Sequence, residues 1–465
     1  MAVRFALLGM ILCALTPAAV IGAETPGSAA LSANGTWEAD PFPEGTPVRS
    51  DHVAVYDPVR DRMLVFGGNS YSTPTSCCIR RGELFAMSLG EDPVWIELAN
   101  TEPSPRRSPT MIYDPVRDRL ILFGGVDDRY ANEQFIGTIF NDVWVMDLSG
   151  PTVWNLVTPN GIAPSARYGH SAIYDPVRDR MLVFAGLGVN YYSDNGVWEL
   201  SLSGTPTWTQ LTTSGAPPTW RADHVGLYDP LRDRMLIVGG SRADTYDEVW
   251  ELSLGTSPTW TKLNTSNSLT APHPLQSYDY AVIYDPRRDR LVVHGGSIYT
   301  NQVHALSLHG APAVRRWELL VPEGGPTPSG SRHSAVYDPS RDQMVLYGNT
   351  GPSSLGASRL VWGQLVSVDN PLPRRALLHA PSPNPSLGDI DIQLDMPERS
   401  AATITVSDIQ GRRVATLEQR TFEAGSHHVR WQGRDEGGAS VAAGVYYVLA
   451  EGAGWIEMRR IVLMR

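Results

Sequence analysis

Short apolar runs separated by polar turns recur along most of the chain. An apolar run over residues 53–56 leads into the turn 57–61, and a second apolar run over residues 63–66 ends at Gly67 and Gly68. Two apolar runs joined by Asp and Pro predict an antiparallel β-hairpin. The pattern returns with Tyr-Asp-Pro triplets that begin at residues 56, 113, 174, 228, 284 and 337. Six units spaced by 53 to 61 residues predict a repeat architecture.

Each unit continues with two more predicted strands. A third apolar run follows a loop of variable length, and a fourth carries a Trp at position 95, 154, 208, 260 or 317. Four antiparallel strands in a unit of this length are typical of one β-propeller blade. The sixth unit has no Trp strand after it, whereas residues 34–38, before the first hairpin, contain Trp37. We therefore expect this N-terminal strand to complete the sixth blade and close the ring, which removes two exposed sheet edges.

The repeats resemble kelch-type β-propellers, which share paired glycines after the second strand, an aromatic residue on the third and a Trp on the fourth. The resemblance covers residues 33–368 and implies an all-β, six-bladed propeller. Ala185-Gly186 and Gly348-Asn349 replace the paired glycines in the third and sixth units, so the strand register is less defined there. Kelch proteins range from binding platforms to copper oxidases, and the resemblance therefore leaves the function open.

The N-terminus has the pattern of a secretory signal peptide over residues 1–23, in which Arg4 precedes an apolar run and small residues follow it. Cys13 lies inside that run and is assigned no role. No later stretch has the roughly 20 apolar residues of a membrane-spanning helix, so none is expected in the mature chain. The other two cysteines, Cys77 and Cys78, are adjacent. They are either unrelated loop thiols, a vicinal disulfide, or a metal or redox pair.

The chain changes character after residue 368. A proline-rich linker over residues 369–385 cannot join a sheet ladder, and the alternating short strands of residues 386–465 predict a small β-sandwich. This tail resembles the FlgD-like immunoglobulin domain and the type IX secretion C-terminal sorting domain at residues 406–414, 424–433 and 443–447. The resemblance implies contact with an outer-membrane export machinery and a location in the medium or on the outer cell surface, reached through the periplasm. The alternative is a sandwich that acts only as a stable C-terminal module.

Charge and composition narrow the classes of partner. The chain has 49 acidic and 38 basic residues, a formal net charge of -11, and Lys262 is its only lysine. Nucleic acid and anionic lipid reward basic surfaces, so neither is expected as a partner. The 43 glycines and 36 prolines gather largely in the strand ends, the hairpin turns and the linker, where they punctuate the β-structure.

The repeated turn at residues 57–62 carries two aspartates and two arginines in the first unit. An acidic pair in each blade suggests calcium, but a simpler interpretation accounts for each residue. The first Asp can accept hydrogen bonds from turn amides, Pro presets φ, and Arg can neutralise the second Asp or reach a neighbouring blade.

Two further sets of polar residues precede the inner strand of each unit, where a propeller has its central channel. They lie seven and four residues before the repeat Tyr, and the candidates among them are Arg167, His170, Arg221, His224 and His333. These side chains can form hydrogen bonds between blades, and the alternatives are ligand contact or a metal site.

The loops between the second and third strands are the preferred binding surface. Their candidate residues are Tyr71, Asp127, Asp128, Arg129, Tyr130, Phe135, Tyr191 and Tyr192. Aromatic, acidic and amide side chains around a concave mouth suit sugar or peptide binding, although variable surface loops would also contain them. We therefore expect an exported bacterial binding protein, secreted or at the cell surface, that recognises a glycan or a protein, and we assign no catalytic residue, metal or cofactor. The alternative is a secreted carbohydrate-active enzyme or a copper oxidase-like propeller.

Overall fold

The computed structural model describes residues 34–39, 49–70, 79–90, 93–128, 130–131, 134–189, 194–241, 247–267, 274–275, 279–297, 301–309, 315–324, 328–349, 355–362, 376–379, 381, 386, 388–396, 399–408, 412–423, 425–452 and 455–463. The predicted signal peptide, Cys77, Cys78 and most of the linker lie outside these residues. Within them no helix is long and apolar enough to cross a membrane.

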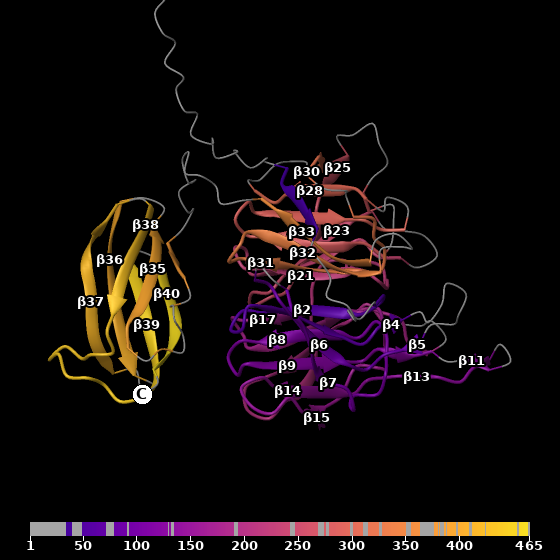
Figure 1. Cartoon of the computed structure of the whole chain (residues 1–465), viewed down its shortest axis with the longest axis horizontal. Coiled ribbons are helices and arrows are strands. Elements are labelled where there is room, and N and C mark those ends of the chain that lie inside the picture. The colour runs from indigo at the N-terminus through magenta and orange to yellow at the C-terminus, as the bar shows by residue number, and fades with distance from the viewer. Residues whose placement is uncertain are drawn as a thin grey trace, which may run out of the picture.

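The described part of residues 34–362 forms six four-stranded antiparallel blades, which Figure 1 shows in indigo to orange. Blades one to three contain β2 (Val53–Asp57), β3 (Arg62–Phe66), β6 (Leu84–Ser88) and β7 (Trp95–Ala99); β8 (Thr110–Asp114), β9 (Arg119–Phe123), β14 (Val143–Asp147) and β15 (Trp154–Val157); and β17 (Ser171–Asp175), β18 (Arg180–Phe184), β19 (Val197–Ser201) and β20 (Thr207–Leu211). Blades four to six contain β21 (Val225–Asp229), β22 (Arg234–Val238), β23 (Val249–Ser253) and β24 (Trp260–Lys262); β26 (Ala281–Asp285), β27 (Arg290–His294), β28 (Val303–Ser307) and β29 (Arg315–Leu320); and β31 (Ser334–Asp338), β32 (Gln343–Asn349), β33 (Leu355–Val361) and β1 (Thr36–Ala39). The all-β fold class predicted from the sequence is confirmed.

The N-terminal strand β1 completes the sixth blade, as the orphan Trp predicts. It pairs antiparallel with β33, and Trp37 lies opposite Leu360. The inner strands β2, β8, β17, β21, β26 and β31 contact one another in a cycle, because β31 touches both β26 and β2. The first and last blades are therefore neighbours although they lie at opposite ends of the propeller sequence.

The repeated Trp packs against the preceding blade. Trp154 of blade two lies 5.8 Å from Phe66 of blade one, and Trp208 of blade three lies 5.0 Å from Phe123 of blade two, measured between ring centroids. Both faces of a blade are covered by neighbouring blades, so the second strands are buried along most of their length. This two-sided burial explains why their sequences are continuous apolar runs and do not alternate.

The C-terminal residues form two packed sheets with a core of their own. One sheet has the order β34 (Leu377–Leu378), β35 (Ile390–Met396) and β38 (Gly425–Trp431), and the other β37 (Arg413–Phe422), β36 (Ser400–Asp408), β39 (Gly444–Gly452) and β40 (Trp455–Leu463). Side chains of β35 alternate between buried and half-buried, and Ile404, Trp431 and Val448 are buried in the same cluster. This is the predicted β-sandwich.

Candidate functional site

The hairpin turns at one end of the blades hold their charged residues in fixed local bonds. In blade one, Asp57 is buried. Its carboxylate accepts hydrogen bonds from the Val59 amide at 3.1 Å and from Arg62 Nε at 2.8 Å. The Tyr56 hydroxyl donates to Asp61 at 3.1 Å. Asp61 has φ of 50°, a left-handed conformation that Asp tolerates better than most residues. The first Asp therefore caps the turn, as the sequence pattern indicates.

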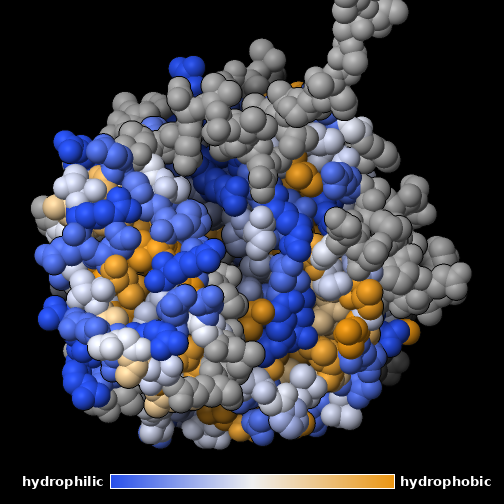
Figure 2. Space-filling model, turned by 60° about the vertical axis from the view of Figure 1, so that its left-hand side comes forward, coloured by the Kyte–Doolittle hydropathy of each residue, from blue (hydrophilic) through white to orange (hydrophobic). Residues whose placement is uncertain are grey.

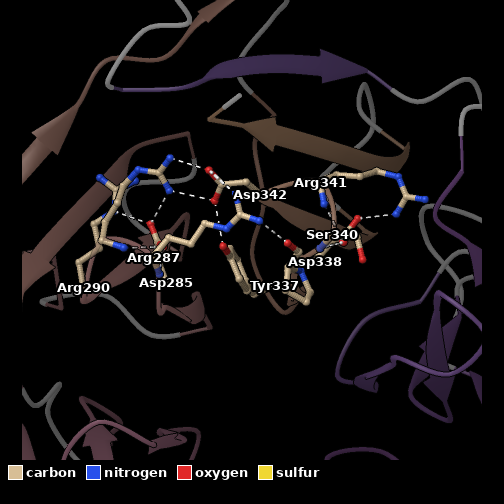
Figure 3. A network of polar contacts seen from close by, with 10 residues as sticks. Asp285, Arg287, Arg290, Tyr337, Asp338, Ser340, Arg341 and Asp342 are labelled. Atoms are coloured by element: carbon tan, nitrogen blue, oxygen red, sulfur yellow. Dashed lines mark hydrogen bonds and ion pairs between the residues drawn. The ribbon is translucent and has the colours of Figure 1, made fainter. Parts of the chain in front are cut away.

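The remaining Arg of each turn reaches the second Asp of the next blade. The six pairs, with their Nη2–Oδ2 distances, are Arg60–Asp118 (2.7 Å), Arg117–Asp179 (2.5 Å), Arg178–Asp233 (2.6 Å), Arg232–Asp289 (2.5 Å), Arg288–Asp342 (2.6 Å) and Arg341–Asp61 (2.5 Å). Figure 3 shows this network around Asp342, Tyr337 and Arg341. We call the six pairs the Arg–Asp ring. Because its carboxylates are all paired with guanidinium groups, this end of the propeller is organised for stability.

The predicted site residues Arg167 and Arg221 each bond to groups of their own blade. Arg167 is buried, donates to the Ala185 carbonyl at 2.9 Å and pairs with Asp194 at 3.1 Å. Arg221 is likewise buried and pairs with Glu248 at 2.9 Å. Burial is the largest influence on Arg167 and lowers its pKa. Each of these side chains ties the connector before the inner strand to the loop of its own blade.

The predicted site histidines join neighbouring blades. His170 Nε2 lies 2.8 Å from Thr110 Oγ1, and His224 Nε2 lies 2.8 Å from Ser171 Oγ. His333 Nε2 lies 2.9 Å from His294 Nδ1.

Burial holds these imidazoles neutral. It lowers the pKa of His224 to about 3 and that of His170 and His333 well below the usual 6.5. The hydrogen bonds match the structural interpretation of this set. Among the described residues, no three His, Cys, Asp or Glu side chains are grouped closely enough to hold a metal ion.

The residue five positions before the repeat Tyr, next to the site histidines, lies at the mouth of the channel opposite the Arg–Asp ring. Residues with positive φ occupy it in every blade: Asp51, Ser108, Gly169, Asp223, Asp279 and Arg332. Backbone amides join neighbouring members, for example Ser108 N to Asp51 O at 2.8 Å and Arg332 N to Asp279 O at 2.8 Å. Their side chains are thereby brought together at one end of the channel, which we call the loop mouth.

Charge at the loop mouth is only partly compensated. Arg332 pairs with Asp279 at 3.0 Å and approaches Asp51 at 3.8 Å, and Asn69 Nδ2 donates to Asp51 at 2.7 Å. No described side chain donates a hydrogen bond to Asp223. Asp223 is exposed to solvent, although many protein atoms lie close around its carboxylate.

The surrounding groups change the proton affinity of these carboxylates. Loss of bulk water around Asp223, together with the nearby charges of Asp279 and Asp51, raises its pKa to about 6. Burial likewise raises the pKa of Asp279. The loop mouth therefore favours a positively charged group or a proton.

The predicted loop residues divide into three groups. Asp128 is held by Arg80 at 2.5 Å and Arg107 at 2.7 Å, which links blades one and two. Asp127 lies in β10 (Val126–Asp127), which pairs with β13 (Thr138–Ile139). The Cα atoms of Tyr130 and Phe135 are partners in the antiparallel register of β11 (Tyr130–Ala131) and β12 (Gln134–Phe135).

These strands form a hairpin that projects from the blades beside β5 (Ile79–Arg80), as Figure 1 shows. The third group, Tyr71, Arg129, Tyr191 and Tyr192, lies outside the described residues.

Sequence reasoning overlooked Asp51, Asp223 and Asp279. The sequence does contain a signal for them, because each comes directly before the position four residues ahead of the repeat Tyr, where His or Tyr stands in these blades. Ser, Gly and Arg occupy the same place in other blades, so the repeat pattern does not mark it as a charged position.

These features define a kelch-repeat propeller followed by an immunoglobulin-like domain. Residues 131–349 match the KLHDC2/KLHL20/DRC7 Kelch-repeats domain, and residues 385–454 match the FlgD Ig-like domain. The kelch and FlgD-like assignments made from the sequence are therefore confirmed.

Individual relatives are distant. Kelch domain-containing protein 3 of Rattus norvegicus is 27% identical over 346 residues, which cover 67% of this chain and 80% of the relative. Adagio protein 3 of Arabidopsis thaliana is 26% identical over 308 residues, covering 63% of this chain and 46% of the relative. The solved structure of YjhT aligns with a TM-score of 0.50 and 14% identity over 68% of this chain and 95% of YjhT, which supports the fold alone.

Proposed function

We propose that the propeller is a protein-binding platform and that its loop mouth receives a basic side chain of the partner. The observation that carries this proposal is the difference between the two ends of the channel. The carboxylates of the Arg–Asp ring are all paired, whereas the Asp223 carboxylate at the loop mouth has no described donor. Placing a Lys or Arg side chain there would compensate the clustered negative charge.

The projecting hairpin from β10 to β13 offers additional surface to a partner at the end of the blades that carries the loops between second and third strands. Figure 2 shows another face of the molecule, on which hydrophilic and hydrophobic residues are mixed.

The proposal extends to an exported protein, in which residues 1–23 direct the first export step and residues 386–465 act in outer-membrane export or surface attachment. The FlgD Ig-like match supports an accessory role for the tail. Fractionation of a bacterial host with such a machinery tests this. Full-length chain should reach the surface or medium, and a chain without residues 386–465 should stay in the periplasm. Equal export of both would contradict the sorting role.

Binding is tested with an array of ten-residue peptides that carry zero to four Lys or Arg. Retention of the full-length protein should rise with basic content, and Asp223→Asn should weaken it. Asp147→Asn, an exposed residue at the Arg–Asp ring end, removes the same charge and should leave retention unchanged. Retention that ignores basic content would refute the proposal, and binding to a glycan array instead would favour sugar recognition.

A further inference from the structure

A second surface lies on the outer edge of the propeller, where short strands cover three of the six blades and a single bridge covers a fourth. The connector that leaves one blade lays a short segment parallel to the outer strand of the next blade. This cover is β16 (Asn160–Gly161) on β20 of blade three, β25 (Thr265–Asn267) on β29 of blade five, and β30 (Glu323–Gly324) on β1 of blade six. In blade four a single parallel bridge joins Ser214 to Thr259.

Three of these covers need glycine for a geometric reason. Gly161, Gly215 and Gly324 have φ of 81°, 75° and 90°, and each follows a polar residue. A Cβ atom on them would lie 2.2, 2.5 and 2.7 Å from the carbonyl oxygen of the blade's Trp. Only a residue without a side chain fits that approach. Blade five differs, because Asn267 stands opposite Trp317 in its cover.

In blades one and two the described residues supply no cover, and only in blade two is the whole preceding connector described. Its connector runs from Trp95 to Arg106 and is two residues shorter than the connector from Trp154 to Arg167. The shortening falls where three of the other connectors have the polar residue and glycine of their covers. Among the described residues, β14 is the only strand that pairs with β15. Within the part of the chain that the structure describes, the outer edge of blade two is therefore open.

The register shows which backbone groups this edge presents. In blade four Trp260 lies opposite Leu252, its amide donates to Ser214 O at 2.9 Å, and Ser214 N donates to Pro258 O at 2.8 Å. Trp154 has the same register opposite Met146, so its N–H and the carbonyl of Thr152 point away from β14. An unpaired strand edge is a template for another extended chain.

The edge also carries exposed apolar side chains. Val153 and Leu156 are 58% and 59% exposed. Blade three has Thr207 and Gln210 at the equivalent positions, beside a covered edge. Exposed apolar side chains beside free backbone groups favour a docking surface over a solvated edge.

We propose that the open edge of β15 binds an extended segment of a protein partner that pairs parallel to it and contains a polar residue followed by glycine. The three glycine-containing covers of this same chain specify that chemistry, since they show what fits against the Trp carbonyl. This edge site is separate from the loop mouth and does not depend on it.

The test uses the full-length protein and the synthetic peptide Thr-Pro-Asn-Gly-Ile-Ala-Pro, which copies residues 158–164. At millimolar peptide, hydrogen exchange of the Trp154 amide should slow by about tenfold. The same peptide with Ala in place of Gly should have no effect. Val153→Thr combined with Leu156→Gln, which copies blade three, should weaken the protection.

Insertion of Asn-Gly between Thr101 and Glu102 should supply the missing cover and slow Trp154 exchange without peptide. The peptide arms use the unmodified protein and remain decisive if this variant fails to fold. Exchange of Trp154 as slow as that of Trp208 in the free protein, or no protection by the peptide, would overturn the proposal. Equal protection by the Ala peptide would refute the glycine requirement. Protection that instead rises with protein concentration would assign the edge to a second copy of the chain.

Discussion

Arg341 of the last blade donates to both carboxylate oxygens of Asp61 of the first, at 3.0 Å to Oδ1 and 2.5 Å to Oδ2. The two residues are 280 positions apart, and their contact completes the Arg–Asp ring. The guanidinium is the largest influence on the Asp61 carboxyl and lowers its pKa. The ends of the propeller are thus joined by charge as well as by β1.

The Arg341–Asp61 pair should show energetic coupling. Asp61→Asn and Arg341→Gln should each reduce the free energy of unfolding, and the double variant should lose less than the sum. For this partly exposed bidentate pair we expect a coupling of about 0.5–1 kcal/mol. Urea unfolding of the four proteins measures it. A coupling of zero would mean that the contact contributes nothing to closure, and the equivalent cycle at Arg117 and Asp179 serves as a control inside the ring.

Trp37→Ala should destabilise the propeller as strongly as a core Trp substitution does elsewhere. Trp37 is 3% exposed and packs 5.4 Å from His294. Removing a buried Trp side chain costs about 3–5 kcal/mol. Trp208→Ala, the same change in an interior blade, is the matched control in urea unfolding. A loss below about 1 kcal/mol for Trp37→Ala alone would show that the N-terminal strand is not needed for stability.

Acid should weaken the propeller through its buried histidines. The folded-state pKa of His224 is about 3, below its ordinary 6.5, because burial disfavours the charged ring. The unfolded chain therefore takes up the proton first, and the stability due to neutral His224 is lost as the pH falls from about 6.5 toward 3. The slope is at most about 1.4 kcal/mol per pH unit for each such group.

His224→Gln should flatten that dependence in denaturant unfolding between pH 7 and pH 5. Between pH 8 and pH 9, where the His224 ring is neutral in both the folded and the unfolded chain, the two proteins should have equal slopes, and this range serves as the control. An identical slope in the wild type and His224→Gln between pH 7 and pH 5 would contradict the assignment.

Asp223→Asn should stabilise the protein at pH 7. The pKa of Asp223 is raised to about 6, so the folded state holds its carboxylate at a disadvantage above that pH. Water in the channel screens the effect, and we expect a gain of about 1 kcal/mol or less. The gain should shrink as the pH falls through 6 and be small at pH 4, where the folded-state carboxyl is protonated and the unfolded one is about half protonated. Thermal unfolding at pH 7 and pH 4 checks this, and a loss of stability at pH 7 would refute it.

The sequence by itself determined the four main strands of the blades, the blade count and the place of the N-terminal strand in the sixth blade. It could do so because these features depend on local chemistry: apolar runs, turn residues such as Asp57, and a Trp that has no hairpin of its own at residue 37. The sandwich strands follow from the same alternation of buried and exposed positions.

Only the tertiary structure decided which polar residues meet. Arg60 reaches Asp118 across 58 positions, and Asp51, Asp223 and Asp279 come together because each blade contributes one residue at the same height of the channel. A repeat pattern shows which residue each blade has at a given position, but it does not show which residue of the neighbouring blade that side chain contacts. The open edge of β15 depends likewise on the absence of two residues in one connector, which has meaning only beside the covered blades.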